Sequence, residues 1–335
     1  MRIAVTGATG FLGGAYARRA LREGDEVVAL VRDPAGVEAR ELELAGARLV
    51  RGSLADPNEI LEAARGAEVL VHAAGLSHRA SAEALYATHV LGTENVVRAV
   101  RAAGVRRLVV LSCADVTLCD ADRVHWAEDR APVGRPVGEY ARSRLLAEEI
   151  ALAHGGPDLE VVAIRPAWPW GPGDRSRLPP LLAEALRGGI RLIGRGESLL
   201  ATAYVDNVVD ALVDATERAE AVGHAFYVQD AEVDEARVFF EQLSHAVGVP
   251  APRSGWPLPV ERLVAAWRER RRAPGLWVAD VLQRGRSSCF DVGSAARRLG
   301  WSARTSRDEG MRALAEWTAR CGGAEAIASR RPPPA

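Results

Sequence analysis

The stretch TGATGFLG at residues 6–13 follows a short apolar run at residues 3–5 and opens a segment of helical periodicity that extends to residue 22. Glycines at these positions permit a tight turn between strand and helix, a close backbone approach to a pyrophosphate, and close packing of the helix on the strand. The first amides of such a helix are available to phosphate oxygens. Because the glycines stand between a predicted strand and a predicted helix, Gly7, Gly10 and Gly13 indicate a dinucleotide site.

Short β-branched runs alternate with longer amphipathic segments from the start of the chain to about residue 165. The pattern predicts strands at residues 3–5, 26–31, 47–51, 69–72, 107–111 and 160–164, and helices that include 11–22, 82–103 and 138–153. Such alternation implies right-handed crossovers and a parallel sheet covered on both faces. The predicted fold class is therefore α/β, a Rossmann doubly wound parallel sheet.

The composition changes after Arg165, where prolines at 166, 169, 172, 179 and 180 interrupt the alternation. Helices are predicted near 178–187, 206–219, 259–272 and 308–320, and the Arg-rich run 268–272 is interpreted as a solvated helix face. We therefore predict a dinucleotide-binding domain at 1–165, to which part of 200–230 returns. A smaller C-terminal substrate-binding lobe is predicted at 166–328, followed by a disordered tail at 329–335.

The charged residues exclude several kinds of chemistry. All 43 basic side chains are Arg, so the chain has no lysine for a Schiff base or for a P-loop. They balance 44 acidic side chains, which gives no overall attraction to nucleic acid or to an anionic membrane surface. No apolar run is long enough to span a membrane, and no His/Cys cluster has metal-ligand spacing. We expect a cytoplasmic protein with reduced thiols, no metal, no membrane span and no nucleic-acid partner.

A positive charge stands where the second predicted strand ends. Arg32 occupies the position at which a site for NAD would place an acidic side chain on the adenosine ribose. A guanidinium suits the additional phosphate of NADP, while Asp33 is expected to face away or to cap the next helix. NADP is therefore the predicted cofactor, in preference to NAD. The alternative is that Arg32 is an ordinary solvated side chain at the start of a loop.

Tyr140 and Arg144 lie four residues apart in a predicted helix and so share one face. A tyrosine in this setting can deliver a proton to a carbonyl group if a neighbouring cation lowers its pKa. An exposed structural pair is the alternative, and spacing alone does not decide between them.

Motifs along nearly the whole chain carry a family resemblance. The motifs are TGATGFLG from Thr6, VRDP from Val31, RGSLADP from Arg51, VHAAG from Val71, GTENV from Gly92, YARSR from Tyr140, RPAWPWGPGD from Arg165, YVDNVVDA from Tyr204 and LGW from Leu299. With these motifs the chain resembles an extended short-chain dehydrogenase/reductase of the NAD-dependent epimerase/dehydratase superfamily, most of all its 3β-hydroxysteroid dehydrogenase-like and dihydroflavonol-reductase-like members.

The resemblance implies a catalytic group in which only the tyrosine matches the family pattern. It makes Tyr140 the acid/base and places Arg144 where the family has lysine. The family's serine falls on Cys113, with Ser112 beside it as a substitute if the register differs by one. Its asparagine falls on His89.

The resemblance also implies which residues contact the cofactor. Ser53 stands where the family has an aspartate near the adenine. The implied cofactor-binding residues are Gly7, Thr9, Gly10, Phe11, Leu12, Gly13, Arg32, Ser53, Leu54, Ala73, Ala74, Gly75, Tyr140, Arg144 and Pro166.

The physical chemistry of the replacements predicts their effects. Arg144 keeps a positive charge near Tyr140, but it cannot lose a proton and so breaks a lysine-mediated relay. The thiol of Cys113 is a weaker donor than a hydroxyl. His89 can supply a replacement proton path or play a structural role, and the structural role is favoured.

The substrate is predicted to be a largely apolar ketone or alcohol. Relatives that act on nucleotide sugars usually have an arginine five residues before Val205, where this chain has Leu200. Trp168, Trp170, Trp256 and Trp267 suit an apolar substrate, although tryptophans are also ordinary core residues. The predicted function is NADP-dependent hydride transfer between ketone and secondary alcohol. The alternatives are a nucleotide-sugar epimerase or dehydratase and an NADP(H)-binding protein with little catalysis. The oligomeric state stays open, with a homodimer as one option.

Overall fold

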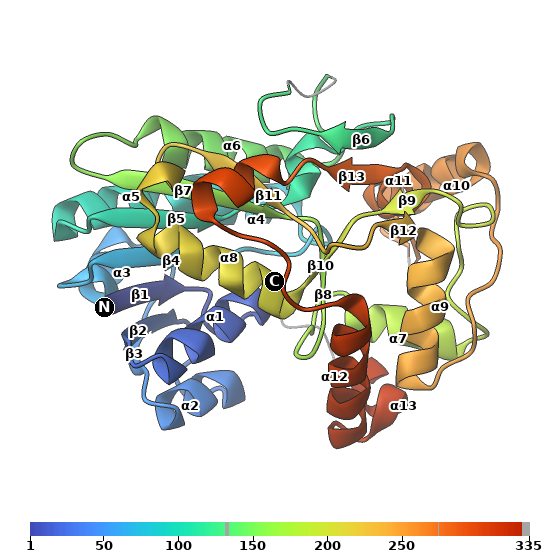
Figure 1. The fold of residues 1–335 in the computed structure, drawn as a ribbon, viewed down its shortest axis with the longest axis horizontal. Coiled ribbons are helices and arrows are strands. Elements are labelled where there is room, and N and C mark those ends of the chain that lie inside the picture. The colour runs from blue at the N-terminus through green and yellow to red at the C-terminus, as the bar shows by residue number, and fades with distance from the viewer. Residues whose placement is uncertain (131–133, 274, 330–335) are drawn as a thin grey trace.

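Seven parallel strands form the central sheet in the order β11-β7-β5-β4-β1-β2-β3 (Figure 1). The computed structural model describes residues 1–130, 134–273 and 275–329. The strand order reverses at β1, as in a doubly wound sheet, and confirms the predicted α/β class. The strands are β1 (Arg2–Thr6), β2 (Glu26–Val31), β3 (Arg48–Arg51), β4 (Val69–His72), β5 (Arg107–Leu111), β7 (Glu160–Pro166) and β11 (Ala225–Val228).

Alternate side chains of the sheet pack into two separate cores. Ile3 and Val5 of β1 pack on one face, whereas Ala4 between them packs on the other. The first face is covered by α1 (Phe11–Arg22), α2 (Val37–Leu44) and α8 (Val205–Glu217), and the second by α3 (Pro57–Ala64), α5 (Gly92–Ala103) and α6 (Glu139–Ala153). Because both faces are covered, the strands read as continuous apolar runs, which is why sequence analysis located them well.

The segment predicted as one helix at residues 82–103 is interrupted. It begins as α4 (Ala82–Leu85), passes through a π-helical turn at Tyr86–Leu91 and continues as α5. A π-helical turn accommodates one additional residue without ending the helix, so the apolar periodicity stays almost unchanged. The predicted helical stretch at 82–103 is confirmed, although the π-helical turn within it, which contains His89, was not predicted.

The C-terminal part forms a smaller lobe, but its strand β11 joins the large sheet and its helix α8 packs on one face of that sheet (Figure 1). Within the described ranges, no helix is both long enough and apolar enough to cross a membrane. The predicted tail at 329–335 lies outside the described residues, except for Ser329. The remaining elements are β6 (Arg123–Trp126), β8 (Trp168–Trp170), α7 (Leu178–Leu186), β9 (Leu199–Leu200), β10 (Thr202–Tyr204), β12 (Asp234–Glu235), α9 (Ala236–Val247), α10 (Leu258–Arg270), α11 (Val278–Gly285), β13 (Ser288–Phe290), α12 (Arg307–Arg320) and α13 (Gly323–Ala328).

A buried carboxylate joins the smaller lobe to the sheet. Asp230, 2% exposed, follows β11 and accepts hydrogen bonds from four groups. These donors are Trp170 Nε1 at 2.7 Å, Thr202 Oγ1 at 2.8 Å, the Tyr204 amide at 2.7 Å and Asn207 Nδ2 at 3.0 Å. They come from β8, β10 and α8, so one side chain fixes three elements at the lobe boundary.

A buried ion pair fixes helix α6 to the sheet. The guanidinium of Arg165 on β7 donates to both oxygens of Glu148 on α6, through Nε at 2.9 Å and Nη2 at 2.5 Å. The two-point geometry of arginine with a carboxylate restricts rotation as well as distance. Helix α6 also carries Tyr140, so this pair helps to fix where the tyrosine stands relative to the strand ends.

Candidate active site

The glycine loop after β1 is shaped so that side chains would not fit. Gly7 has φ of +71°, and a Cβ atom there would lie 2.5 Å from the Ala74 amide nitrogen. A Cβ atom on Gly13 would lie 2.4 Å from the Gly7 carbonyl oxygen. Helix α1 has no side-chain cap at Gly10 and no acidic residue in its first turn, so its amides remain available to an anion. These features fit the pyrophosphate of a dinucleotide.

The other predicted cofactor residues surround this loop at the carboxyl ends of the strands. Ala73 follows β4, and its amide donates to the Thr6 carbonyl at 3.1 Å. Gly75 lies against Arg144, because a Cβ atom at 75 would come within 2.0 Å of Nη2. Thr9 is exposed, whereas Leu12 and Pro166 are buried. The strand ends thus bring the predicted residues to one edge of the sheet.

The region predicted to receive the adenosine half is polar. The Ser53 amide donates to the Glu59 carboxylate at 2.7 Å. Arg32 is exposed immediately after β2 and forms no hydrogen bond or ion pair within the described chain. Asp33 accepts the Ala35 amide at 3.0 Å and so stabilises the following turn. Arg32 is consequently available to an added phosphate.

Tyr140 stands in the first turn of α6 beside a fixed positive charge. Arg144 places its guanidinium carbon 5.7 Å from the centre of the Tyr140 ring and donates through Nη1 to the Leu111 carbonyl at 3.2 Å. Burial raises the pKa of Tyr140 to about 12, while the charge of Arg144 acts in the opposite direction. The phenol therefore holds its proton at neutral pH and can act as a proton donor.

Cys113 is the residue that the fold brings to Tyr140 from the end of β5. Burial raises the pKa of the Cys113 thiol to about 12, and a hydrogen bond between the Cys113 and Tyr140 side chains opposes that shift. The thiol is therefore neutral and a weak donor. Ser112 is buried, and its hydroxyl has no hydrogen-bond partner among the residues that the structure describes.

His89 is held at both ring nitrogens. The Leu76 amide donates to Nε2 at 3.0 Å, so Nδ1 carries the proton of the neutral ring and donates to Ser143 Oγ at 2.8 Å. Ser143 in turn donates to the Tyr140 carbonyl oxygen at 3.0 Å. This chain ends on the backbone of Tyr140 and not on its hydroxyl. His89 therefore positions the first turn of α6, and these bonds provide no proton path to the phenol.

A second buried histidine extends the network to the glycine loop. The Thr6 hydroxyl donates to His72 Nδ1 at 2.7 Å, and His72 Nε2 donates to Thr93 Oγ1 at 3.1 Å. Thr93 donates to the carbonyl oxygen of His89. Strand β1, strand β4 and the π-helical turn are thereby connected by polar side chains from three separate motifs, and the sequence did not show that these side chains contact one another.

Acid is expected to destabilise the fold through these two histidines. Burial, reinforced by the charge of Arg144, lowers the pKa of His89 to about 2 and that of His72 to about 3. Below about pH 6.5 the unfolded chain binds protons that the folded chain excludes, so the free energy of unfolding falls as pH falls. Each histidine contributes at most about 1.4 kcal/mol per pH unit. Denaturant titrations between pH 5 and 7 measure this slope.

His89→Asn removes one titrating group and retains both a donor and an acceptor. We expect this variant to have a shallower dependence of unfolding free energy on pH than the parent, by up to about 1.4 kcal/mol per pH unit. Exposed His154 provides the matched control, since His154→Asn should leave the slope unchanged. Equal slopes for the parent and His89→Asn would contradict the assignment of a neutral, buried His89.

Three polar residues that sequence analysis did not select lie between Tyr140 and the smaller lobe. Gln283 on α11 donates to Asp115 at 2.5 Å, and Arg177 donates to Gln283 at 3.2 Å. Arg177 also lies 3.7 Å from the Asp115 carboxylate, and its charge offsets a small part of the burial-driven rise in the pKa of Tyr140. The positions are far apart in sequence and form no local motif.

A second polar group connects the loop after β4 to α11. Asp280 lies 3.1 Å from His78 Nε2 and accepts a hydrogen bond from Arg79 at 2.8 Å. The His78 ring is 6.5 Å from the ring of Tyr140 and 6.3 Å from that of Trp277. Helix α11 thus covers the side of the site next to the tyrosine.

The four tryptophans predicted near the substrate have different environments. Trp168 and Trp170 line a narrow, mainly apolar pocket, and Arg177 stacks on Trp168 at 5.3 Å. Trp256 and Trp267 are 49% and 54% exposed, so they are not core residues, and their place near the substrate stays a prediction. Trp267 lies on the solvent-facing side of α10. The buried residues of this helix are Ala265 and Glu261, which pairs with Arg191. The other lining residues of the pocket are Gly171, Asp174, Leu178, Leu181, Phe239, Leu243 and Leu314.

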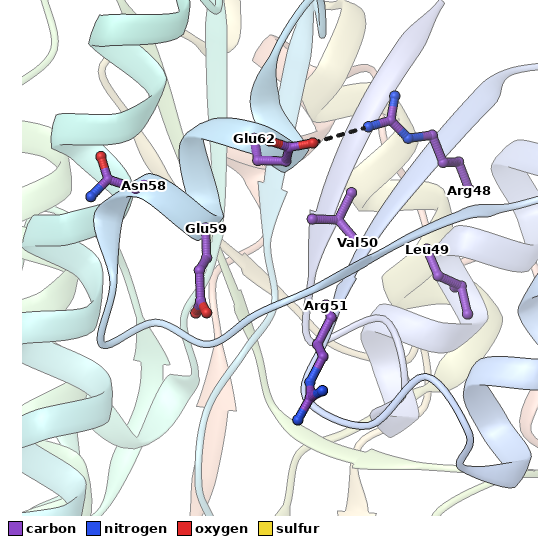
Figure 2. Close-up of a pocket in the computed structure, with 7 residues that line it drawn as sticks. All are labelled: Arg48, Leu49, Val50, Arg51, Asn58, Glu59 and Glu62. Atoms are coloured by element: carbon purple, nitrogen blue, oxygen red, sulfur yellow. Dashed lines mark ion pairs between the residues drawn. The ribbon is translucent and has the colours of Figure 1, made fainter.

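Figure 2 shows another pocket, formed by the edge strand β3 and helix α3. Strands β2, β1 and β4 separate β3 from β5, so this pocket is remote from Tyr140. An ion pair of 3.7 Å joins Arg48 and Glu62 at its rim. Its lining residues are Arg48, Leu49, Val50, Arg51, Asn58, Glu59 and Glu62, a polar set that belongs to the sheet edge and not to the reaction site.

Comparisons with known proteins agree with this geometry. The model of the NAD dependent epimerase/dehydratase family matches residues 3–228. A 2-alkyl-3-oxoalkanoate reductase from Stenotrophomonas maltophilia is 32% identical, with 94% of this chain and 98% of that protein covered. A 4-hydroxy-2-methyl-3-oxo-4-farnesyl-3,4-dihydroquinoline-1-oxide ketoreductase from Stigmatella aurantiaca is 31% identical, with 94% and 96% covered.

A solved structure, MoeE5 in complex with UDP-glucuronic acid and NAD, is 27% identical and superposes with a TM-score of 0.76 over 96% of this chain and 99% of that one. The predicted resemblance to extended short-chain dehydrogenase/reductases is confirmed by these matches. The chain belongs to the NAD dependent epimerase/dehydratase family, as an NAD(P)-dependent oxidoreductase of the extended short-chain type.

Proposed function

We propose that this protein is an NADP-dependent reductase that interconverts a ketone and a secondary alcohol on a largely apolar substrate. The observation that carries the proposal is a protonated Tyr140 placed beside Arg144 and Cys113 at the sheet edge that holds the glycine loop. Both relatives described above are named as reductases of keto compounds with alkyl or farnesyl groups.

The side chains of the site can perform the proton half of such a reaction. The bound nicotinamide supplies the hydride. Tyr140 donates its phenolic proton to the substrate oxygen, and the charge of Arg144 stabilises the tyrosinate that is left. Cys113 contributes a weak hydrogen bond toward the same oxygen. Arg144 cannot return a proton, so water must restore the phenol.

Arg32 is expected to give a preference for NADPH over NADH. Its guanidinium is exposed at the end of β2 and unpaired within the described chain, as a phosphate ligand must be. One charge-assisted contact of about 1.5 to 3 kcal/mol corresponds to roughly a tenfold to hundredfold difference in Kd. Fluorescence titration of both cofactors measures it. Arg32→Ala should abolish the preference with little change in NADH affinity, and equal affinities in the parent would reject the assignment.

The replaced catalytic residues give a further prediction. If drift has weakened an ordinary active site, Cys113→Ser combined with Arg144→Lys should raise kcat by about threefold to tenfold, because a hydroxyl is the better donor and lysine restores the relay. Steady-state rates with a shared ketone substrate measure the change, and each single variant serves as a control. A slower double variant would show instead that Cys113 and Arg144 are adapted to this protein's own chemistry.

The side chain of Leu200 argues against a nucleotide-sugar substrate. This residue is 2% exposed and apolar, so it cannot contact a diphosphate as the arginine of such enzymes does. The test is a panel of apolar ketones and nucleotide sugars with NADPH and NADH. Oxidation of NADPH with an apolar ketone is the expected result. Turnover of nucleotide sugars alone would favour an epimerase or dehydratase, and cofactor binding without any turnover would favour a cofactor-binding protein.

A further inference from the structure

Helix α10 presents an apolar stripe to solvent. Val260, Leu263 and Trp267 follow the spacing i, i+3, i+7 on one side of the helix and are 44%, 70% and 54% exposed. Trp256, immediately before the helix, is also exposed. These four belong to only twelve large exposed apolar side chains in the described chain, so the segment 256–267 concentrates a third of them. Single exposed apolar residues are ordinary, but a cluster of this kind indicates a contact surface.

The same stripe is bordered by positive charge. Arg270, Arg271 and Arg272 are exposed around it, and Arg271 stacks on the ring of Trp267 at 5.0 Å, whereas Arg262 forms an ion pair with Asp120. The two acidic residues of the helix are turned to other partners. Glu261 is fully buried and lies 3.2 Å from Arg191, while Glu269 accepts the Val278 amide at 3.2 Å. The outward surface of α10 is therefore apolar and basic.

We propose that α10, with Trp256 before it, docks this protein on an anionic lipid surface. A helix with exposed Trp and Leu on one side and arginines around them is the type that lies in a membrane interface, with its apolar side chains inserted and its cations at the lipid headgroups. Aromatic rings such as that of Trp267 favour the interfacial depth, and each arginine adds attraction to anionic lipid. The balanced net charge of the whole chain does not oppose this, because such attraction is local.

A second copy of the chain fits the surface less well. A symmetric dimer would place the same patch of each copy together, and the exposed arginines of both copies would then lie near one another. Lipid headgroups supply the opposite charge that the patch lacks.

The location of α10 would place the reaction site near the membrane to which the protein is docked. Helix α10 packs against α11, the helix that carries Gln283 and Asp280 over the reaction site. In Figure 1 the two helices lie at the end of the long axis opposite the N-terminus, away from α5 and α6. A protein docked through α10 would hold the α11 side of its site close to the bilayer, where apolar compounds dissolve.

Vesicle co-sedimentation of the full chain tests the proposal without any turnover. The probes are vesicles of phosphatidylcholine alone and of phosphatidylcholine with phosphatidylglycerol. We expect binding to increase with the phosphatidylglycerol fraction and to decrease with salt. Leu263→Ser with Trp267→Ser should weaken binding at least about tenfold, and Arg270→Gln with Arg271→Gln by about tenfold or more.

Matched variants control for loss of apolar surface or charge elsewhere. Val37→Ser with Leu44→Ser removes two exposed apolar side chains from α2, and Arg195→Gln with Arg320→Gln removes two exposed charges. Both should bind vesicles as the parent does. Absence of vesicle binding by the parent, or equal binding by the α10 variants, would overturn the proposal. So would sedimentation velocity showing that Leu263→Ser with Trp267→Ser converts a dimer to a monomer, since a second copy would then cover α10.

Discussion

Tyr140→Phe is expected to lower kcat for ketone reduction by roughly a hundredfold to ten-thousandfold, while NADPH affinity stays within a few fold. The hydroxyl acts in the transition state, and its high pKa keeps the proton on the phenol until the carbonyl oxygen accepts it. Its removal leaves the ring and its contacts with His89 and Arg144 in place. Steady-state kinetics and a fluorescence titration of NADPH separate the two effects.

Tyr86→Phe is the matched control, because Tyr86 is 50% exposed and lies in the π-helical turn. This variant should retain the parental rate. If Tyr140→Phe keeps more than about a tenth of the parental kcat, water or the substrate itself supplies the proton and the role given to Tyr140 is wrong.

Asp230→Ala is expected to reduce the free energy of unfolding by about 4 kcal/mol and the Tm by roughly 10 °C. Four buried donors from β8, β10 and α8 would lose their acceptor together. Denaturant titration and calorimetry measure the loss. Asp158→Ala, at an exposed turn, should change stability little. A loss below about 1 kcal/mol at position 230 would show that these bonds are exchanged for others at low cost.

The sequence was most informative where the structure is most regular. Strands β2, β4 and β5 have the predicted bounds because their side chains are buried on both faces and so form continuous apolar runs. The π-helical turn at Tyr86–Leu91 was not predictable, since one added residue hardly alters a helical pattern. The exposure of Trp267 could not be predicted either, because the spacing of an aromatic residue in a helix does not show whether its side of the helix is buried or exposed.

The candidate site was predictable only where its residues belong to short motifs. Tyr140, Arg144 and the glycine loop were located by spacing and resemblance. The cluster of Asp115, Arg177 and Gln283 was missed because its members come from three distant segments, and only tertiary packing brings them together. The role of His89 also depended on its partners, which are the Leu76 amide and Ser143, and no spacing in the sequence pairs these two residues with His89.

Because α8 and β11 pack on the large sheet, this protein cannot readily be truncated after the N-terminal part or recombined with another protein at that point. A fragment ending at residue 165 would expose the hydrogen-bonding edge of β7 that β11 covers, together with the part of the sheet face that α8 covers. Such an open, apolar edge promotes aggregation. The C-terminal lobe therefore cannot be replaced as one contiguous segment at a single junction. Changes to this lobe are more accessible through substitutions within it than through exchange of the whole segment.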